Sequence, residues 1–135
     1  MQIAKDLDDA QLTLLVTRFY AQVREDSLLA PVFNHAVADW PKHLRTLTDF
    51  WSSVMLTTGR YKGQPMQAHM RHQAEMTPEM FARWLDLWEN TAAQYLPPKE
   101  AAAIIAKAHH IAASLQMALF PSLPPSRTAS DHQRP

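Results

Sequence analysis

Histidine and glycine are distributed unevenly in this chain of 135 residues. Its two glycines, Gly59 and Gly63, lie in one short stretch that is followed by Pro65 and His69. The backbone is therefore most adaptable just before a short proline-initiated segment that carries one histidine. A second histidine, His43, lies upstream on a different predicted helix that also faces the core. The pattern indicates that the chain places His69, and with it His43, at a site that uses imidazole.

One histidine on each side of an apolar pocket suits a haem iron. The chain has no cysteine, which excludes cysteine-based zinc sites and iron–sulfur clusters. A carboxylate-bound metal pair in a helix bundle would need Glu-x-x-His pairs. The residues three positions before His43, His69 and His72 are Trp40, Met66 and His69, so the sequence contains no such pair there.

Composition excludes several classes of partner. The 13 basic and 13 acidic residues balance, which predicts no nucleic-acid partner and no anionic membrane partner. The first residues carry Asp6, Asp8 and Asp9 where a signal peptide would be apolar. No apolar run approaches the roughly 20 residues of a membrane span. We therefore expect a soluble, cytoplasmic, single-domain protein.

Apolar residues recur with helical spacing through most of the chain, which predicts an all-α fold. Asp8 is expected to cap the first helix, with Leu7 and Leu12 packing around the cap. Thr77 followed by Pro78 is a strong helix start. The predicted segments are a helix from residue 8 to about 24, a turn over 28–33 broken by Pro31, a helix from about 39 to 58, a short segment around His69, a helix from 77 to 96, and a last helix ending near 120.

The last residues differ in composition from the rest. From Pro121 onward the chain contains four prolines among serine, threonine, arginine and glutamine. Such a segment buries too little apolar surface to order itself. The sequence thus predicts one domain over residues 1–120 and a disordered tail over residues 121–135.

An ordered set of motifs spans residues 8–120. The motifs are Phe19-Tyr20, the run Arg24, Asp26, Leu29, Pro31, Phe33 and Asn34, then Trp40-x-x-His43, Phe50-Trp51, Tyr61-x-Gly63-Gln64-Pro65-Met66-x-x-His69 and Phe81-x-x-Trp84-Leu85. This set resembles the third group of truncated haemoglobins. The absence of a Gly-Gly pair, together with His43 and Trp84, selects the third group over the others of that family.

This resemblance implies a truncated globin fold, which is a two-over-two sandwich of helices around haem b. It implies that His69 binds the haem iron from the proximal side. The second ring nitrogen of His69 needs an acceptor that fixes the ring, and we expect a backbone carbonyl one turn earlier, near Pro65 or Met66. The residues expected to contact the porphyrin are Phe33, Leu47, Met66 and Trp84.

The resemblance also assigns the opposite, distal side. Tyr20 and Trp84 would donate hydrogen bonds to a bound diatomic ligand, and His43 would lie near the ligand entrance, as a gate or as a direct partner. From the residues alone, Tyr20 could equally be a core tyrosine and Trp84 a packing residue. His72 could pair with His69 as metal ligands, but two imidazoles make a poor zinc site, so a role beside the haem or in solvent is favoured. We assign no chemistry to His35, His109, His110 or His132.

Three classes of function remain open at this point. A monomeric binding protein would hold O₂, NO, CO or cyanide without turnover, with slow release of O₂. An enzyme would oxidise NO with bound O₂ or carry out peroxidase-like chemistry, and would need electrons from an unknown external reductase because the chain has no flavin or nicotinamide motif. A haem-free helical sensor or partner-binding domain is the third class. An absorption spectrum separates the third class from the other two.

Overall fold

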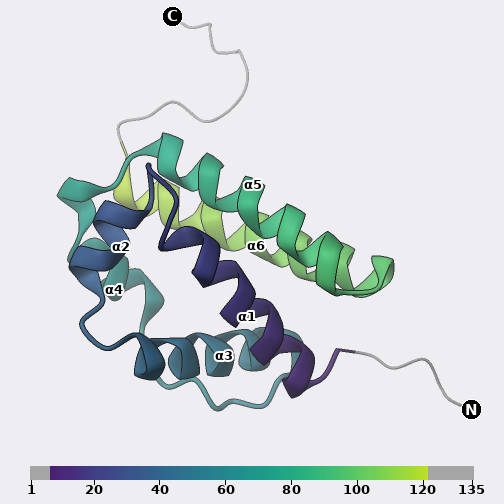
Figure 1. Cartoon of the computed structure of the whole chain (residues 1–135). Coiled ribbons are helices and arrows are strands. Elements are labelled where there is room, and N and C mark those ends of the chain that lie inside the picture. Colours follow the sequence, from purple (N-terminus) through teal and green to yellow (C-terminus); the bar gives the residue numbers. More distant parts are fainter. Residues whose placement is uncertain (1–6, 122–135) are drawn as a thin grey trace, which may run out of the picture.

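The computed structural model describes residues 7–121, and within that range it is built of helices and the loops between them (Figure 1). The predicted all-α fold is confirmed. The elements in chain order are α1 (Asp9–Val23), α2 (Ala30–Ala36), α3 (Trp40–Leu56), α4 (Pro65–Met70), the 3₁₀ turn η1 (Gln73–Glu75), α5 (Pro78–Tyr95) and α6 (Pro98–Leu119).

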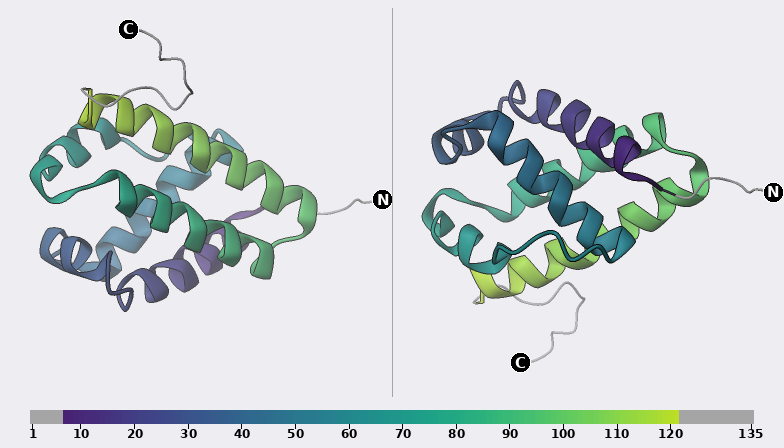
Figure 2. Two further views of the ribbon diagram at one scale, coloured as in Figure 1. Left: turned by 90° about the horizontal axis from the view of Figure 1, so that it is seen from above. Right: turned by 90° about the horizontal axis from the view of Figure 1, so that it is seen from below.

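Two pairs of long helices form the layers of the fold. Helix α1 packs on α3 and on α5, and α5 packs along α6. Figures 1 and 2 show α1 and α3 crossing on one side of the antiparallel α5–α6 pair, with the short α4 lying against α6. The arrangement is the two-over-two sandwich that the resemblance implied. In Figure 1, α2 and α4 lie at the same end of this sandwich, and both contribute to the wall of one cavity.

Helix starts follow the caps that the sequence contains. The Asp8 side chain accepts from the Gln11 backbone N–H at 2.8 Å, and the Gln11 side chain accepts from the Asp8 backbone N–H at 3.0 Å. This reciprocal pair satisfies two backbone donors that the helix itself leaves unpaired. Thr77 caps α5 by accepting from the Met80 backbone N–H, with Pro78 at the first position, as predicted.

The second helix differs from the prediction. We expected a turn over 28–33 that Pro31 would break, but α2 continues to Ala36. Pro31 lies in the first turn of α2, where a missing backbone N–H costs no helical hydrogen bond and a fixed φ favours the helix. The proline thus starts the helix instead of ending it. Phe33 lies in the middle of this helix and lines the cavity.

The core lies between the two layers. Most of its largest fully buried apolar side chains come from three helices, and one comes from the loop before α2: Leu12, Leu15, Val16, Phe19 and Val23 on α1, Trp88 on α5, Ile104 on α6, and Leu29 in the loop. Burying such side chains contributes roughly 1.5–3 kcal/mol each. The core therefore holds α1, α5 and α6 together along most of their length, and it leaves the end near α2 and α4 less filled.

Two parts of the predicted domain organisation stay predictions. The described range ends at residue 121, so the proposed tail lies outside it except for the exposed Pro121. The proposed start of the domain at residue 1 also precedes the described residues. Among the helices that the structure describes, none combines the length and the apolar character that crossing a membrane requires.

A carboxylate in the α1–α2 loop fixes this loop against α5. Oδ2 of Asp26 accepts from the backbone N–H groups of Leu28 and Leu29 at 3.1 and 3.0 Å, and Oδ1 accepts from Nε of Arg83 at 2.7 Å. The Asp26 side chain is only 7% exposed. Its burial raises the pKa of the carboxyl, but the hydrogen bonds and charge from Arg83, Leu28 and Leu29 outweigh burial and hold the pKa below its ordinary value.

We expect Asp26→Asn to destabilise the protein at neutral pH, because it removes the charge that Arg83 and two backbone donors bind. A hydrogen bond to a charged group is worth about 1.5–3 kcal/mol, which sets the scale of the loss in unfolding free energy. A carboxyl with a lowered folded-state pKa contributes its stability above its unfolded-state pKa and loses it as the pH falls through the folded-state value. Urea unfolding of both proteins across the acidic range should therefore show the difference shrinking towards low pH.

Asp86→Asn is the matched control for this prediction. Asp86 accepts from the same Arg83 at 3.3 Å, but its side chain is 61% exposed. Exposed ion pairs contribute little, so this variant should unfold almost as the unmodified protein does. An Asp26→Asn effect that is equal to that of Asp86→Asn, or that does not change with pH, would contradict the role given to Asp26.

Candidate functional site

One large cavity of about 830 Å³ opens where the core is least filled. Its wall is formed by α2, α3, α4, α5 and α6, with Tyr20 of α1 at its inner end. Apolar side chains make up most of that wall, and a few polar groups converge on it, as is usual for a cofactor or ligand site. Of the predicted site residues, those that line the cavity are Tyr20, Phe33, His43, Leu47, His69 and Trp84.

His69 lies on α4 with its ring orientation fixed. Its Nδ1 is 2.7 Å from the carbonyl oxygen of Pro65, one turn earlier, so Nδ1–H donates and Nε2 carries the free lone pair. The expectation that a carbonyl near Pro65 or Met66 orients this ring is thereby confirmed. A neutral imidazole whose other nitrogen donates to a carbonyl is the form in which histidine binds a metal.

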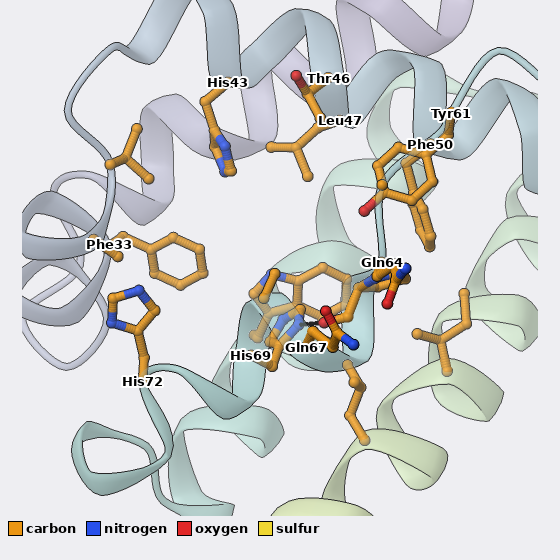
Figure 3. A pocket seen from close by; sticks show the side chains of 18 of the residues that line it. Phe33, His43, Thr46, Leu47, Phe50, Tyr61, Gln64, Gln67, His69 and His72 are labelled. Atoms are coloured by element: carbon orange, nitrogen blue, oxygen red, sulfur yellow. Dashed lines mark hydrogen bonds between the residues drawn. The ribbon is translucent and has the colours of Figure 1, made fainter.

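His43 faces the same cavity from α3. Figure 3 shows His43 and His69 on opposite sides of the pocket. The His43 ring packs edge-on against Trp40, with the centroids 5.6 Å apart, and lies 6.4 Å from the Tyr20 ring. Burial, together with the proximity of His69, lowers the pKa of His43 below its ordinary value. His43 is therefore a neutral side chain at neutral pH that can donate or accept one hydrogen bond in the cavity.

Tyr20 is a buried phenol at the inner end of the cavity. It is 3% exposed, and its ring contacts Phe19, Phe33 and Trp40 with centroids 4.6–6.0 Å apart. Burial raises the pKa of Tyr20 far above its ordinary value, and the neighbouring Trp84 indole opposes this shift only in part. The hydroxyl is therefore protonated at neutral pH, and it can act as a hydrogen-bond donor.

Trp84 reaches the cavity from α5. It is half-buried, packs edge-on against Phe19 at 5.2 Å and stacks on Trp88 at 5.3 Å with the ring planes 9° apart. An indole N–H can only donate. The structure thus brings two donors that are uncharged at neutral pH, Tyr20 and Trp84, to the same cavity.

The predicted porphyrin contacts divide into two groups. Phe33 and Leu47 line the cavity together with Trp84. Met66 does not: it lies outside the lining and is 38% exposed. The reason is the short helix α4, where Pro65, Ala68 and His69 form the half-buried face, so Met66 and Met70 fall on the solvent side.

Sequence reasoning gave no site role to Phe50 and Tyr61, yet both line the cavity. Their rings pack edge-on at 5.2 Å. The Tyr61 ring folds over Gly63, where an added Cβ would lie 2.5 Å from the Tyr61 hydroxyl oxygen. Gly63 therefore leaves room for Tyr61, whereas Gly59 is required for its own backbone, with φ at 71°. The Tyr-x-Gly spacing was the available signal.

At the edge of the site, the side chains of His35 and Glu75 join α2 to the segment after α4. Glu75 of η1 contacts His35 of α2 at 2.9 Å and His72 at 3.5 Å. The hydrogen bond from His35 is the main cause that lowers the pKa of Glu75. His72 lines the cavity and is half-buried, so it is not the solvent-facing histidine that was one of its expected roles.

A two-over-two helical sandwich, closed around an apolar pocket with a fixed imidazole on one wall, is an architecture of the globin class. No protein-family model matches the chain. The chain is 29% identical over 121 residues to the group 3 truncated hemoglobin ctb of Campylobacter jejuni subsp. jejuni serotype O:2, covering 84% of this chain and 92% of that protein.

A solved structure also resembles this chain. The crystal structure of a group III truncated hemoglobin from Campylobacter jejuni superposes with a TM-score of 0.79 at 27% identity, covering 93% of this chain and 100% of the other. The resemblance to group III truncated haemoglobins is confirmed in sequence and in structure, and the fold is the truncated globin fold.

Proposed function

We propose that the protein binds haem b in the 830 Å³ cavity and uses it to bind diatomic gases reversibly, O₂ in particular. The observation that carries this proposal is the orientation of His69, whose Nδ1–H donates to the Pro65 carbonyl and whose Nε2 is free for iron. The apolar wall fits a porphyrin, since burying its faces removes a large hydrophobic surface from water. Haem, when bound, supplies an iron with one open coordination position.

The remaining side chains have roles in this proposal that follow from their positions. Phe33, Leu47 and Trp84 contact the porphyrin. Tyr20 and Trp84 donate hydrogen bonds to O₂, which takes on negative charge when it binds, and the dry surroundings strengthen each bond. His43, on the wall opposite His69, controls access or adds a third partner. Slow O₂ release follows from this set of donors.

A second candidate is enzymatic: NO oxidation with bound O₂, or peroxidase-like reduction of peroxides. The observation that favours it is the pair of protonated donors, Tyr20 and Trp84, because such donors also assist cleavage of an O–O bond. Either reaction needs electrons from an external reductant. Steady consumption of NO or peroxide in the presence of a reductase would separate this candidate from simple ligand binding, which predicts no turnover.

Titration of the haem-free protein with haemin tests the proposal. We expect saturation at one haem per chain with a sharp Soret band, followed by distinct ferrous, O₂ and CO spectra. Haem should also raise the free energy of unfolding, by about 4 kcal/mol when free haem is 1,000 times its dissociation constant. His72→Ala is a useful companion, because His72 lines the cavity but is not the proposed ligand. A weak, unsaturable spectral change would contradict haem binding.

A further inference from the structure

Three tryptophans form a continuous stack beside the cavity. Trp84 stacks on Trp88 with centroids 5.3 Å apart and planes 9° apart, and Trp88 stacks on Trp51 of α3 at 4.7 Å and 21°. Trp84 and Trp51 line the cavity, whereas Trp88 is fully buried and does not line it. The three indoles therefore form one stack of aromatic rings that spans the sandwich from α5 to α3.

The central indole has an unusual environment. Among the buried side-chain nitrogen and oxygen atoms of residues 7–121, Nε1 of Trp88 is the one without a hydrogen-bond partner. A buried donor without an acceptor costs free energy, so its presence calls for an explanation. An indole that loses one electron becomes a cation and normally passes its N–H proton to an acceptor. At Trp88 the proton has no acceptor, so the loss of an electron is reversible there.

The neighbours of Trp88 favour such a cation. The faces of Trp84 and Trp51 cover both sides of its ring, and the negative face of an indole attracts positive charge. Exclusion of water around the 0% exposed Trp88 strengthens this attraction but also removes solvation from the charge, so spreading the charge over several rings is what lowers its cost. The stack is thus suited to hold one positive charge that is shared over three rings.

From Trp51 the aromatic contacts continue towards solvent. Trp51 packs edge-on against Phe50 at 5.3 Å, and Phe50 packs edge-on against Tyr61 at 5.2 Å. Tyr61 lies in the partly exposed loop between α3 and α4, with Arg60 and Lys62 on either side of it. A phenol that loses an electron also loses its proton, and at Tyr61 water is available to accept it.

We propose that Trp84, Trp88 and Trp51 form an electron relay between the wall of the haem pocket that carries Tyr20 and Tyr61, which lines the same cavity from the partly exposed loop between α3 and α4, and that Tyr61 is the point at which small phenolic reductants deliver electrons. This inference rests on the proposed haem binding and gives the enzymatic candidate a route for its electrons. Trp84 is the inner end because it lies beside Tyr20, where a bound oxygen species would react. Phe50 is a spacer that is not itself oxidised.

The electrons balance with hydrogen peroxide as the oxidant. Peroxide takes up two electrons and two protons, its O–O bond breaks, and two molecules of water leave. Each electron passes inward from the Tyr61 phenol through the stack, and the Tyr61 proton goes to water. Each time, a phenolic reductant then gives one hydrogen atom to Tyr61 and leaves as a phenoxyl radical. Two reductant molecules are consumed for each peroxide.

Radical trapping tests the relay. Ferric, haem-loaded protein is mixed with one equivalent of hydrogen peroxide and a nitroso spin trap, with no reductant, and the labelled peptides are identified by mass spectrometry. We expect the adduct on Tyr61. Trp88→Phe keeps an aromatic ring in the stack but removes its low oxidation potential, so most of the Tyr61 adduct should disappear. Trp88 does not line the cavity, so the haem spectrum should be retained.

Tyr95→Phe is the matched control, since Tyr95 is a partly exposed tyrosine at the end of α5 whose ring is approached by Arg18 and not by the stack. It should leave the Tyr61 adduct unchanged. Tyr61→Phe should shift the adduct to an indole. This shift would show that the radical passes through the tryptophan stack, and it can be measured even if the Trp88→Phe protein does not fold. Equal Tyr61 adduct with and without Trp88, or labelling of Tyr20 or Tyr95 in place of Tyr61, would overturn the relay.

Failure of haem binding and failure of the relay give different results. If haemin gives no saturable Soret band, haem binding and the relay both fail. If one haem binds per chain and Tyr61 is not labelled, only the relay fails.

Discussion

Replacing His69 with alanine should abolish stable haem binding. Within the cavity, His69 is the histidine whose ring is fixed by a backbone carbonyl, so its loss removes the bond to iron and leaves only apolar contacts to the porphyrin. The measurement is the haem stoichiometry after gel filtration, together with the ferrous spectrum. We expect the purified variant to lose its Soret band while its helical content, which depends on the core of α1, α5 and α6, is retained.

Control variants and a chemical rescue make this test specific. His72→Ala removes a neighbouring imidazole that also lines the cavity, and His109→Ala removes an exposed histidine that contacts Glu89 on the outside of α5 and α6. Both should keep one haem per chain, as should His43→Ala and His110→Ala. Added imidazole should restore the band in His69→Ala. A His69→Ala protein with full haem content and a five-coordinate, histidine-bound ferrous spectrum would show that another residue is the ligand.

Local features of the fold were predictable because they depend on residues close in sequence. The caps at Asp8 and Thr77 each need a side chain and a backbone N–H three residues apart, and both form as expected. Long helices were predictable from apolar spacing. Short helices were not, since a few residues do not define a periodic pattern. For this reason Pro31 was taken for a helix breaker and Met66 for an inward-facing residue.

Contacts between distant charged residues could not be predicted. Arg60 binds the Asp9 carboxylate through two nitrogen atoms at 3.0 and 2.6 Å, although the two residues are 51 positions apart, and Arg83 reaches Asp26 across 57 positions. From the sequence alone, any of several acidic residues could be the ion-pair partner of either arginine. The first contact joins the loop that carries Tyr61 to the start of α1.

Most of the predicted site residues do line the cavity, but the contacts among the tryptophans could not be predicted from the motifs. The sequence contains the four tryptophans, and their helical spacing places them inward. Only the crossing of α3 and α5 decides that Trp51 meets Trp88 face to face. The unpaired Nε1 of Trp88 is likewise a property of packing that no spacing encodes.

Tyr20→Phe should accelerate O₂ dissociation far more than CO dissociation. Bound O₂ carries partial negative charge and accepts a strong hydrogen bond, whereas bound CO is nearly neutral and accepts a weak one. Tyr20 is 3% exposed and remains protonated because burial raises its pKa, so its donor is present at every pH of interest. Losing a hydrogen bond to a charged group costs about 1.5–3 kcal/mol. This corresponds to roughly a 10- to 100-fold increase in the O₂ off-rate.

Two further variants separate hydrogen bonding from packing. Trp84→Phe should change the off-rates in the same direction, since its indole N–H is the second donor at this wall. Tyr95→Phe alters a tyrosine at the far end of α5, outside the cavity, and should leave both gases unaffected. The double variant of Tyr20 and Trp84 should not show the product of the two single effects, because both donors share one acceptor.

Stopped-flow measurements of O₂ and CO dissociation from the unmodified protein and these variants decide the role of Tyr20. A hydrogen-bond donor changes the two gases unequally, with the larger change for O₂. A packing residue changes the shape of the cavity, and shape affects both gases alike. Small and equal changes for O₂ and CO in Tyr20→Phe would therefore make Tyr20 a core residue, and the slow O₂ release proposed for this protein would then have no structural basis at this wall.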